Sequence, residues 1–174
     1  MKKLTIALLS GGISSERDVS LSSGQKVYEA LDKTRYDILR YDPKTDLAEL
    51  AANADRIDAA LVILHGPYGE DGTVQGMLDL LGIPYQGAGV LGSAVAMNKL
   101  AAKRLYEHAG LKVPPYCIVR RGPIPELGGC VQHVGLPIVV KPVAGGSSIG
   151  MAIAASEKEL HDAVVEAFEF DESV

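Results

Sequence analysis

The chain has 174 residues, of which 47% are hydrophobic and 22% are charged, as in an ordinary globular protein. Its formal net charge of -5 argues against the basic surface that nucleic-acid binding requires, and no stretch approaches the ~20 apolar residues of a membrane-spanning helix. We therefore expect a cytoplasmic protein that binds neither nucleic acid nor a membrane.

Strands and helices alternate in the first half of the sequence. Residues 4–9 form a first strand, because this apolar run is shorter than the core of a secretory signal peptide and no A-x-A cleavage pattern follows it. Ser15 and Asp18 resemble a capping box at the start of the first helix. The remaining strands are expected at 36–41 and 58–64, and the helices at 18–31, 47–54 and 72–81. This order predicts a doubly wound parallel sheet.

The pattern changes in the second half. A short strand at 83–86, a turn and two helices, the second over 99–109, form a transition. Beyond Pro114 and Pro115 we expect strands at 116–121, 138–141 and 149–154, with helices over 125–134 and from Ser156. Ser156 and Glu159 have the spacing of a capping box. We place a domain boundary near residue 96, which gives an α/β domain over 1–96 and an α+β domain over 97–174.

Two loops follow strands at the carboxyl edge of the predicted sheet, where open α/β sheets bind ligands. Glu16 lies in the first loop and could meet a ligand ammonium group, or it could only charge the first turn of the helix. His65 ends the third strand and is either a ligand contact or a hydrogen-bonded structural residue. Glu70 and Asp71 follow as a possible carboxylate pair, although Asp71 is equally well placed to cap the next helix.

The stretch "VKPVAGGSSIG", residues 140–150, has the composition of a phosphate-binding loop. Gly145 and Gly146 allow backbone N–H groups to turn toward an anion, and Lys141 adds a point charge. Ser147 and Ser148 add hydroxyl donors. The alternative is a Gly-Ser hairpin beside a solvated lysine. The stretch is not a Walker A loop, because the sequence contains no G-x-x-x-x-G-K-[ST] pattern.

Other motifs favour structural interpretations. Residues 87–92, "GAGVLG", match the dinucleotide fingerprint G-x-G-x-x-G, but the full apolar strand that should precede it is missing, so a glycine-rich turn into a helix is the better account. Cys117 and Cys130 are interpreted as free thiols in a reducing compartment rather than as metal ligands. No hydrolase elbow, H-E-x-x-H or EF-hand pattern occurs.

In this order the motifs closely resemble the D-alanine–D-alanine ligases, which are ATP-grasp enzymes of peptidoglycan synthesis. The stretches that carry the resemblance are 10–24, 64–89, 97–103 and 137–151, and it extends over essentially the whole chain. It implies an N-terminal substrate-binding domain, the pre-ATP-grasp domain, followed by the first lobe of the ATP-grasp domain. It also implies a homodimer, with ATP and Mg²⁺ or Mn²⁺ as cofactors and D-alanine as substrate.

The resemblance also assigns roles to residues. Glu16 is expected to hold the ammonium group of the first D-alanine, with Ser147 as its hydrogen-bonding partner and His65 beside the substrate. Glu16 and Ser147 are therefore the expected catalytic residues. The expected ATP contacts are Lys99, Lys141, Gly145, Gly146, Ser147 and Ser148.

The sequence departs from the family at its C-terminal end. The second ATP-grasp lobe, which in the family carries the adenine and ribose contacts and the metal ligands, is expected to be absent. We therefore expect the chain alone to be inactive, since phosphoryl transfer would lack its main charge neutralisation. The alternatives are a non-catalytic α/β binding or dimerisation module derived from the ligase and, less favoured, a nicotinamide-type dinucleotide protein that uses the 87–92 glycines.

Overall fold

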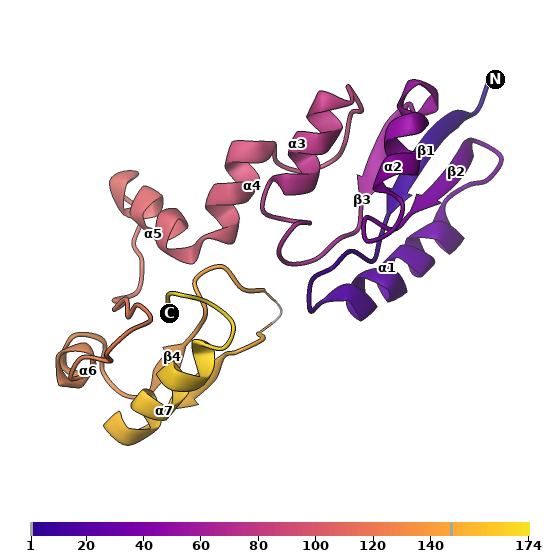
Figure 1. Ribbon diagram of the computed structural model, residues 1–174. Helices are drawn as coiled ribbons and strands as arrows, with labels where there is room; N and C mark the ends of the chain where they lie inside the picture. The colour runs from indigo at the N-terminus through magenta and orange to yellow at the C-terminus, as the bar shows by residue number, and fades with distance from the viewer. Residues whose placement is uncertain (1, 147) are drawn as a thin grey trace. The chain divides into compact units, whose positions relative to one another are not determined.

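Three parallel strands organise the first half of the chain (Figure 1). The computed structural model describes residues 2–146 and 148–174. Strand β1 (Leu4–Leu9) lies between β2 (Tyr36–Tyr41) and β3 (Ala59–Val62), in the order β2-β1-β3. In this register Leu8 lies opposite Arg40 on one side and Leu61 on the other. The predicted parallel sheet is confirmed.

Helices lie on both faces of this sheet. After β1 the chain forms α1 (Arg17–Ala30); after β2 it forms α2 (Leu47–Ala52) and a short 3-10 turn, η1 (Ala54–Arg56); and after β3 it forms α3 (Thr73–Leu80). Right-handed crossovers from β1 to β2 and from β2 back to β3 place α1 and α2 on opposite faces, as Figure 1 shows. Ala7 and Leu9 pack with Leu50 of α2 in one buried cluster. The side chain of Leu8 points to the opposite face of the sheet and is also fully buried.

A close approach sets the position of α1. Gly24 of α1 faces Ser10, and a Cβ atom at position 24 would overlap the Ser10 side chain. The hydroxyl of Ser20, one turn earlier, accepts a hydrogen bond from the N–H of Gly11 at 2.8 Å and donates to the carbonyl of Ile63. Small residues therefore allow α1 to lie directly against the loops that leave β1 and β3.

The second half of the chain packs around a different core. Helix α4 (Val90–Met97) begins within the 87–92 glycine stretch, as predicted, and is followed by α5 (Lys99–His108) and α6 (Gly128–Val134). Strands β4 (Ile138–Val140) and β5 (Ala152–Ala154) pair antiparallel, and α7 (Glu157–Ala167) covers them. The buried cluster of this half consists of Val119, Leu127, Ile138, Val140, Ala154, Leu160, Ala163, Val164, Ala167, Phe168 and Val174. This arrangement agrees with the predicted α+β lobe.

The chain divides into two compact units, one ending at Ala94 and the other beginning at Val95. The division lies within α4, two residues before the predicted boundary, and the assignment of two functional domains stays a prediction. Among the helices of residues 2–146 and 148–174, none has both the length and the apolar composition that crossing a bilayer requires.

Three local predictions were wrong. The expected strands at 83–86 and 116–121 are only isolated bridges, from Ala60 to Tyr85 and from Arg120 to Ser173. Beyond Tyr85 the side chain of Gln86, rather than its backbone, bonds Val62 of β3, so the ladder does not continue. The expected cap of α1 by Ser15 also fails. The N-cap is Glu16, whose side chain makes no capping bond, and the N–H of Glu16 donates to the hydroxyl of Ser14 at 3.2 Å.

Half of the predicted capping box of α7 forms: Ser156 caps the helix, whereas the Glu159 side chain bonds the residue before the cap. The Ser156 hydroxyl accepts from the N–H of Glu159 at 3.2 Å, and the Glu159 carboxylate accepts from the N–H of Ala155 at 2.8 Å.

An ion pair fixes the loop between β1 and α1. The Asp42 carboxylate, at the end of β2, accepts hydrogen bonds from Arg17 and from the N–H groups of Gly12 and Lys44. Burial alone raises the pKa of Asp42, but these hydrogen bonds outweigh it and lower the pKa from 3.8 to about 2. Gly11 and Gly12, both with positive φ, turn tightly around this carboxylate.

We expect Asp42→Asn to lower the free energy of unfolding by about 2 kcal/mol at pH 7, because the charge-assisted hydrogen bonds are lost. The folded-state pKa of Asp42 is depressed, so its contribution is complete above about pH 4 and is lost as the pH falls toward 2. Urea unfolding at pH 7 and at pH 2.5 measures this. The difference in the free energy of unfolding between wild type and variant should be smaller at pH 2.5.

Asp37→Asn is the matched control. Asp37 forms an exposed ion pair with Lys3, so its loss should change stability by less than about 0.5 kcal/mol. An equal loss in both variants would contradict the anchoring role of Asp42.

Candidate functional site

Glu16 occupies the N-terminal end of α1 and is only 4% exposed. It is held there by the loop from Ser10 to Ser15, which the Arg17–Asp42 ion pair fixes. The positive end of the helix dipole favours its ionised carboxylate. A carboxylate buried to this extent is costly unless a cationic or hydrogen-bonding partner meets it.

His65 follows β3 and reaches the same region. The Ser14 hydroxyl donates to the backbone carbonyl of His65 at 2.8 Å, which joins the loop after β1 to the loop after β3. The Nε2 atom of the imidazole is buried and has no hydrogen-bond partner among the described residues. Buried polar atoms are nearly always paired, so an unpaired nitrogen favours the ligand interpretation of His65, which stays a prediction.

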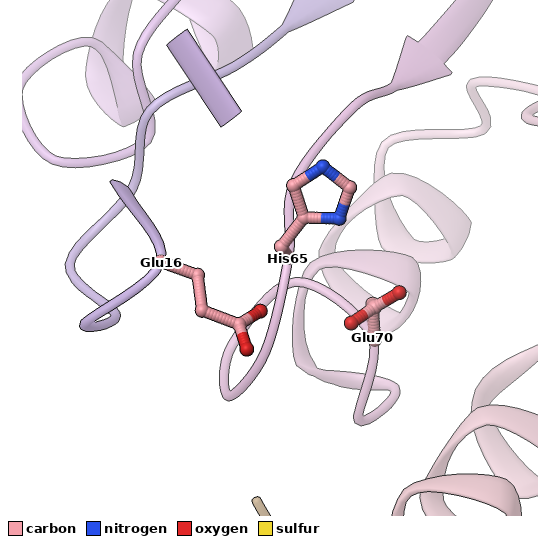
Figure 2. A group of neighbouring side chains, drawn as sticks. All are labelled: Glu16, His65 and Glu70. Carbon is pink, nitrogen blue, oxygen red and sulfur yellow. The ribbon is translucent and has the colours of Figure 1, made fainter. Parts of the chain in front are cut away.

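Glu70 completes a cluster with Glu16 and His65, which we call the carboxylate–histidine cluster (Figure 2). One ligand atom from each of the three side chains lies within 4.8 Å of the others. Glu70 accepts a hydrogen bond from the N–H of Gly66 at 2.7 Å. A Cβ atom at Gly66 would lie 3.2 Å from a Glu16 carboxylate oxygen, so glycine at this position leaves room for that carboxylate.

Two carboxylates around one imidazole form a site for a cation. An ammonium group would find two acceptors of opposite charge, and a divalent metal would find three ligand atoms. Asp71 does not belong to the cluster: its carboxylate accepts from the N–H groups of Tyr68 at 2.8 Å and Thr73 at 3.0 Å, at the start of α3. The N-cap of α3 is Gly72, so Asp71 is not the helix cap, although its carboxylate holds the N–H of the first helical residue, Thr73.

A second group of predicted residues lies in the other compact unit. Lys99 is the first residue of α5, where the Asn98 side chain accepts from the N–H of Ala101 at 2.9 Å. The backbone N–H of Lys99 donates to Val143 at 3.0 Å, and its ammonium group donates to the carbonyls of Pro142 at 2.9 Å and Gly145. Lys99 is therefore attached to the loop that follows β4.

Lys99 and Lys141 are close enough to repel each other. Burial lowers the pKa of Lys99, and the charge of Lys141 lowers it further, while Asp171 acts in the opposite direction. Lys141 is itself exposed at the end of β4. Two neighbouring ammonium groups are the charge pattern that a polyphosphate neutralises.

The loop that follows Lys141 has an unusual backbone. Ser148 has a φ of 60°, which is rare for a residue with a side chain, and Ile149 donates to the carbonyl of Gly146 at 3.1 Å. Asp171 accepts from the N–H of Ala144 at 2.6 Å and so fixes one end of the loop. Gly145 is half-buried against Pro142. Ser147, predicted in both sites, lies outside the described residues.

A cavity of about 500 Å³ lies in the same unit, beside the two lysines. Its wall is mostly apolar and includes Val140, Val143 and Ile138, while Lys99 and Lys141 supply charge. A cavity with an apolar wall and two cations suits a ligand that has both an apolar part and an anionic part.

Some site residues escaped sequence reasoning. Ser14 and Asp171 act through contacts with residues 51 and 27 positions away, and no local pattern marks such contacts. Asn98 did carry a marker, since asparagine just before an apolar-periodic helix is a common N-cap.

The chain was compared with family models and known proteins. Residues 40–88 match the model described as D-ala D-ala ligase N-terminus, and residues 105–174 match that described as D-ala D-ala ligase C-terminus. The chain is 58% identical over 170 residues to D-alanine–D-alanine ligase of Syntrophobacter fumaroxidans, covering 98% of this chain and 55% of the relative. It is 52% identical over 159 residues to the same enzyme of Desulfotalea psychrophila, covering 91% and 49%.

Solved structures give the same result. The crystal structure of D-alanine–D-alanine ligase from Bacillus anthracis aligns with a TM-score of 0.86 at 37% identity, covering 98% of this chain and 55% of that one. A structure of the Bacillus anthracis enzyme complexed with ATP aligns with a TM-score of 0.84 at 35% identity, covering 98% and 56%. The chain thus spans about half the length of the curated relatives it matches.

If Glu16 serves to bind a ligand, its buried charge should lower the free energy of unfolding of the unliganded protein. We expect Glu16→Gln to leave the free energy of unfolding within about 0.5 kcal/mol of wild type, or to raise it. Ser20→Ala, at an equally buried residue of the same helix, should lower it by about 2 kcal/mol because two buried partners lose their hydrogen bonds. Thermal and urea unfolding of both variants measure this, and an equal loss in Glu16→Gln would indicate a structural role.

Proposed function

Because the chain belongs to the D-alanine–D-alanine ligase family, we propose that the complete gene product joins two D-alanines in an ATP-dependent reaction. The product, D-alanyl-D-alanine, serves peptidoglycan synthesis, and through it cell-wall biogenesis and cell shape. The observation that carries this proposal is the charge of the two clusters. The acidic cluster of the first unit suits the ammonium group of an amino acid, and the two lysines of the second unit suit the phosphates of ATP.

The carboxylate–histidine cluster binds the first D-alanine. Glu16 accepts hydrogen bonds from its ammonium group, and the imidazole of His65 lies beside the substrate. Glu70 adds a second negative charge and is itself held by the N–H of Gly66. A buried carboxylate and an ammonium group satisfy each other, so the cluster selects an amino acid by its charged amine.

Lys99 and Lys141 bind the phosphates of ATP, with Gly145, Gly146 and Ser148 of the adjoining loop. The ATP complex of the similar Bacillus anthracis enzyme supports this assignment. Phosphate oxygens would replace the loop carbonyls that the Lys99 ammonium group now contacts, and would remove the repulsion between the two lysines. The apolar wall of the cavity is suited to the less polar part of the nucleotide.

The residues of this chain act by positioning and by charge neutralisation. ATP supplies the phosphoryl group that turns the first D-alanine's carboxylate into an acyl phosphate, and the amine of the second D-alanine displaces phosphate to form the peptide bond. Lys99 and Lys141 neutralise the charge that moves during phosphoryl transfer. Glu16 fixes the amino acid by its ammonium end, which keeps the carboxylate in place.

A divalent cation does not find its ligands among the described residues near these lysines. For residues 2–146 and 148–174, the single trio of His, Cys, Asp or Glu side chains close enough to share an ion is the carboxylate–histidine cluster, which lies in the other unit and contains an imidazole. Mg²⁺ prefers oxygen ligands. We propose that Mg²⁺ or Mn²⁺ accompanies ATP with ligands from the part of the relatives' length that this chain does not span.

The remaining proposals concern the protein as a whole. Its substrates are small molecules and its net charge is -5, which favours a cytoplasmic enzyme that binds neither nucleic acid nor a membrane. A homodimer is proposed from the family resemblance. The 174-residue chain on its own is proposed to be inactive, since it spans 55% of its relative's length.

The proposal predicts that the complete gene product releases phosphate only when ATP, Mg²⁺ and D-alanine are present together. A coupled phosphate assay with each component omitted in turn measures this. ATP hydrolysis at the same rate without D-alanine would contradict the assigned reaction, and turnover by the 174-residue chain would contradict its proposed inactivity.

Two substitutions should separate the two clusters. Glu16→Gln should reduce kcat/KM for D-alanine about a hundredfold, because a charge-assisted bond to the ammonium group is lost, while the KM for ATP changes little. Lys141→Ala should instead raise the KM for ATP about tenfold or more. Lys158→Ala, at an exposed lysine of α7, is the control and should leave both constants unchanged. Wild-type kinetics in both site variants would refute the residue assignments.

A further inference from the structure

The two cysteines of the chain line the same cavity. They are the only cysteines among the 174 residues and lie 13 positions apart on different elements. Cys117 belongs to the irregular segment that precedes Val119, and Cys130 lies in the first turn of α6. Both line the same cavity of about 500 Å³, both are partly buried, and both are free thiols.

The thiols differ in their surroundings. Cys130 packs against the buried cluster of this unit, and its pKa is raised to about 11 by burial and by a side-chain hydrogen bond with Cys117. At neutral pH Cys130 therefore keeps its proton and can donate it in a hydrogen bond to Cys117. The two sulfurs therefore differ in position: Cys130 packs against the buried cluster, whereas Cys117 lies on the irregular segment that lines the cavity.

Cations line the cavity that both cysteines share. Lys99, Lys103 and Lys141 contribute to its wall, and Lys103 lies over the ring of Tyr116, the neighbour of Cys117, at 4.5 Å from the centroid. The thiolate is the reactive form of cysteine. The cavity therefore combines the two thiols with three side chains that carry ammonium groups.

We propose that Cys117 and Cys130 form a dithiol site that closes to an intrachain disulfide on reaction with a small-molecule disulfide. The Cys117 thiolate attacks one sulfur of the reagent, forming a mixed disulfide and releasing one thiolate. The sulfur of Cys130 then attacks the sulfur of Cys117, and its proton passes to the second departing thiolate. Two protein thiols are oxidised, and one disulfide is reduced to two thiols.

Closure would change the unit that holds the phosphate-binding lysines. The new bond would join α6 covalently to the segment before Val119, across the wall of the cavity that Lys99 and Lys141 also line. A cross-link between these residues also restricts the unfolded chain, so the oxidised form should unfold at a higher temperature.

The test uses the reduced 174-residue chain and oxidised glutathione under native conditions. Intact-mass measurement should show the wild type losing two hydrogen atoms, with both thiols then resistant to alkylation. Cys117→Ser and Cys130→Ser should each stop with one glutathionyl group. A wild-type product that carries two glutathionyl groups, or a chain dimer linked by cysteine, would overturn the proposal.

A second measurement tests whether disulfide closure depends on the native fold or only on the short distance between the two cysteines in the sequence. Closure should be at least about tenfold faster in the native chain than in urea at the same pH, because the fold holds the two sulfurs together. Equal rates, or slower closure in the native chain, would overturn the proposal. The oxidised wild type should also melt above the reduced form, and the shift should vanish in both serine variants.

Discussion

The hydrogen bond from Ser14 to the backbone carbonyl of His65 joins the two loops on which the first cluster depends. These loops leave β1 and β3, which are neighbours in the parallel sheet and end at the same edge. Parallel pairing brings the loops together, the Asp42 carboxylate fixes the turn of the first one, and Gly66 leaves the space that the Glu16 carboxylate needs. The position of one buried acid thus follows from sheet order, an ion pair and a missing side chain.

Each half of the protein concentrates like charge. In one unit two carboxylates lie around an imidazole. In the other, burial lowers the pKa of Lys99 and the neighbouring charge of Lys141 lowers it further. Such arrangements are unfavourable in the unliganded protein and become favourable when a group of opposite charge binds. The two clusters are complementary in sign to an amino acid's ammonium group and to a nucleotide's phosphates.

Local patterns predict many of the elements and the place of Glu16 at the start of a helix. The Ser156 cap, the alternation of strands and helices and the position of Glu16 after a strand all depend on residues close together in the chain. The strand expected at 116–121 failed because a strand requires a partner, and only a short segment at the end of the chain meets it. Asp171, which holds the loop after β4, lies 27 residues from its contact and left no trace in any local pattern.

The contact between Gly24 and Ser10 has an implication for how this family can vary. Since no Cβ fits at position 24, that glycine determines how far α1 lies from the sheet, and α1 carries Glu16 at its first turn. A larger residue there would move the helix outward, and the acid with it, although position 24 touches no ligand. Under the substrate role proposed for Glu16, substrate preference in natural or laboratory variants can therefore be altered from the side of α1 that faces the sheet, and a search for specificity changes should include helix–sheet spacing.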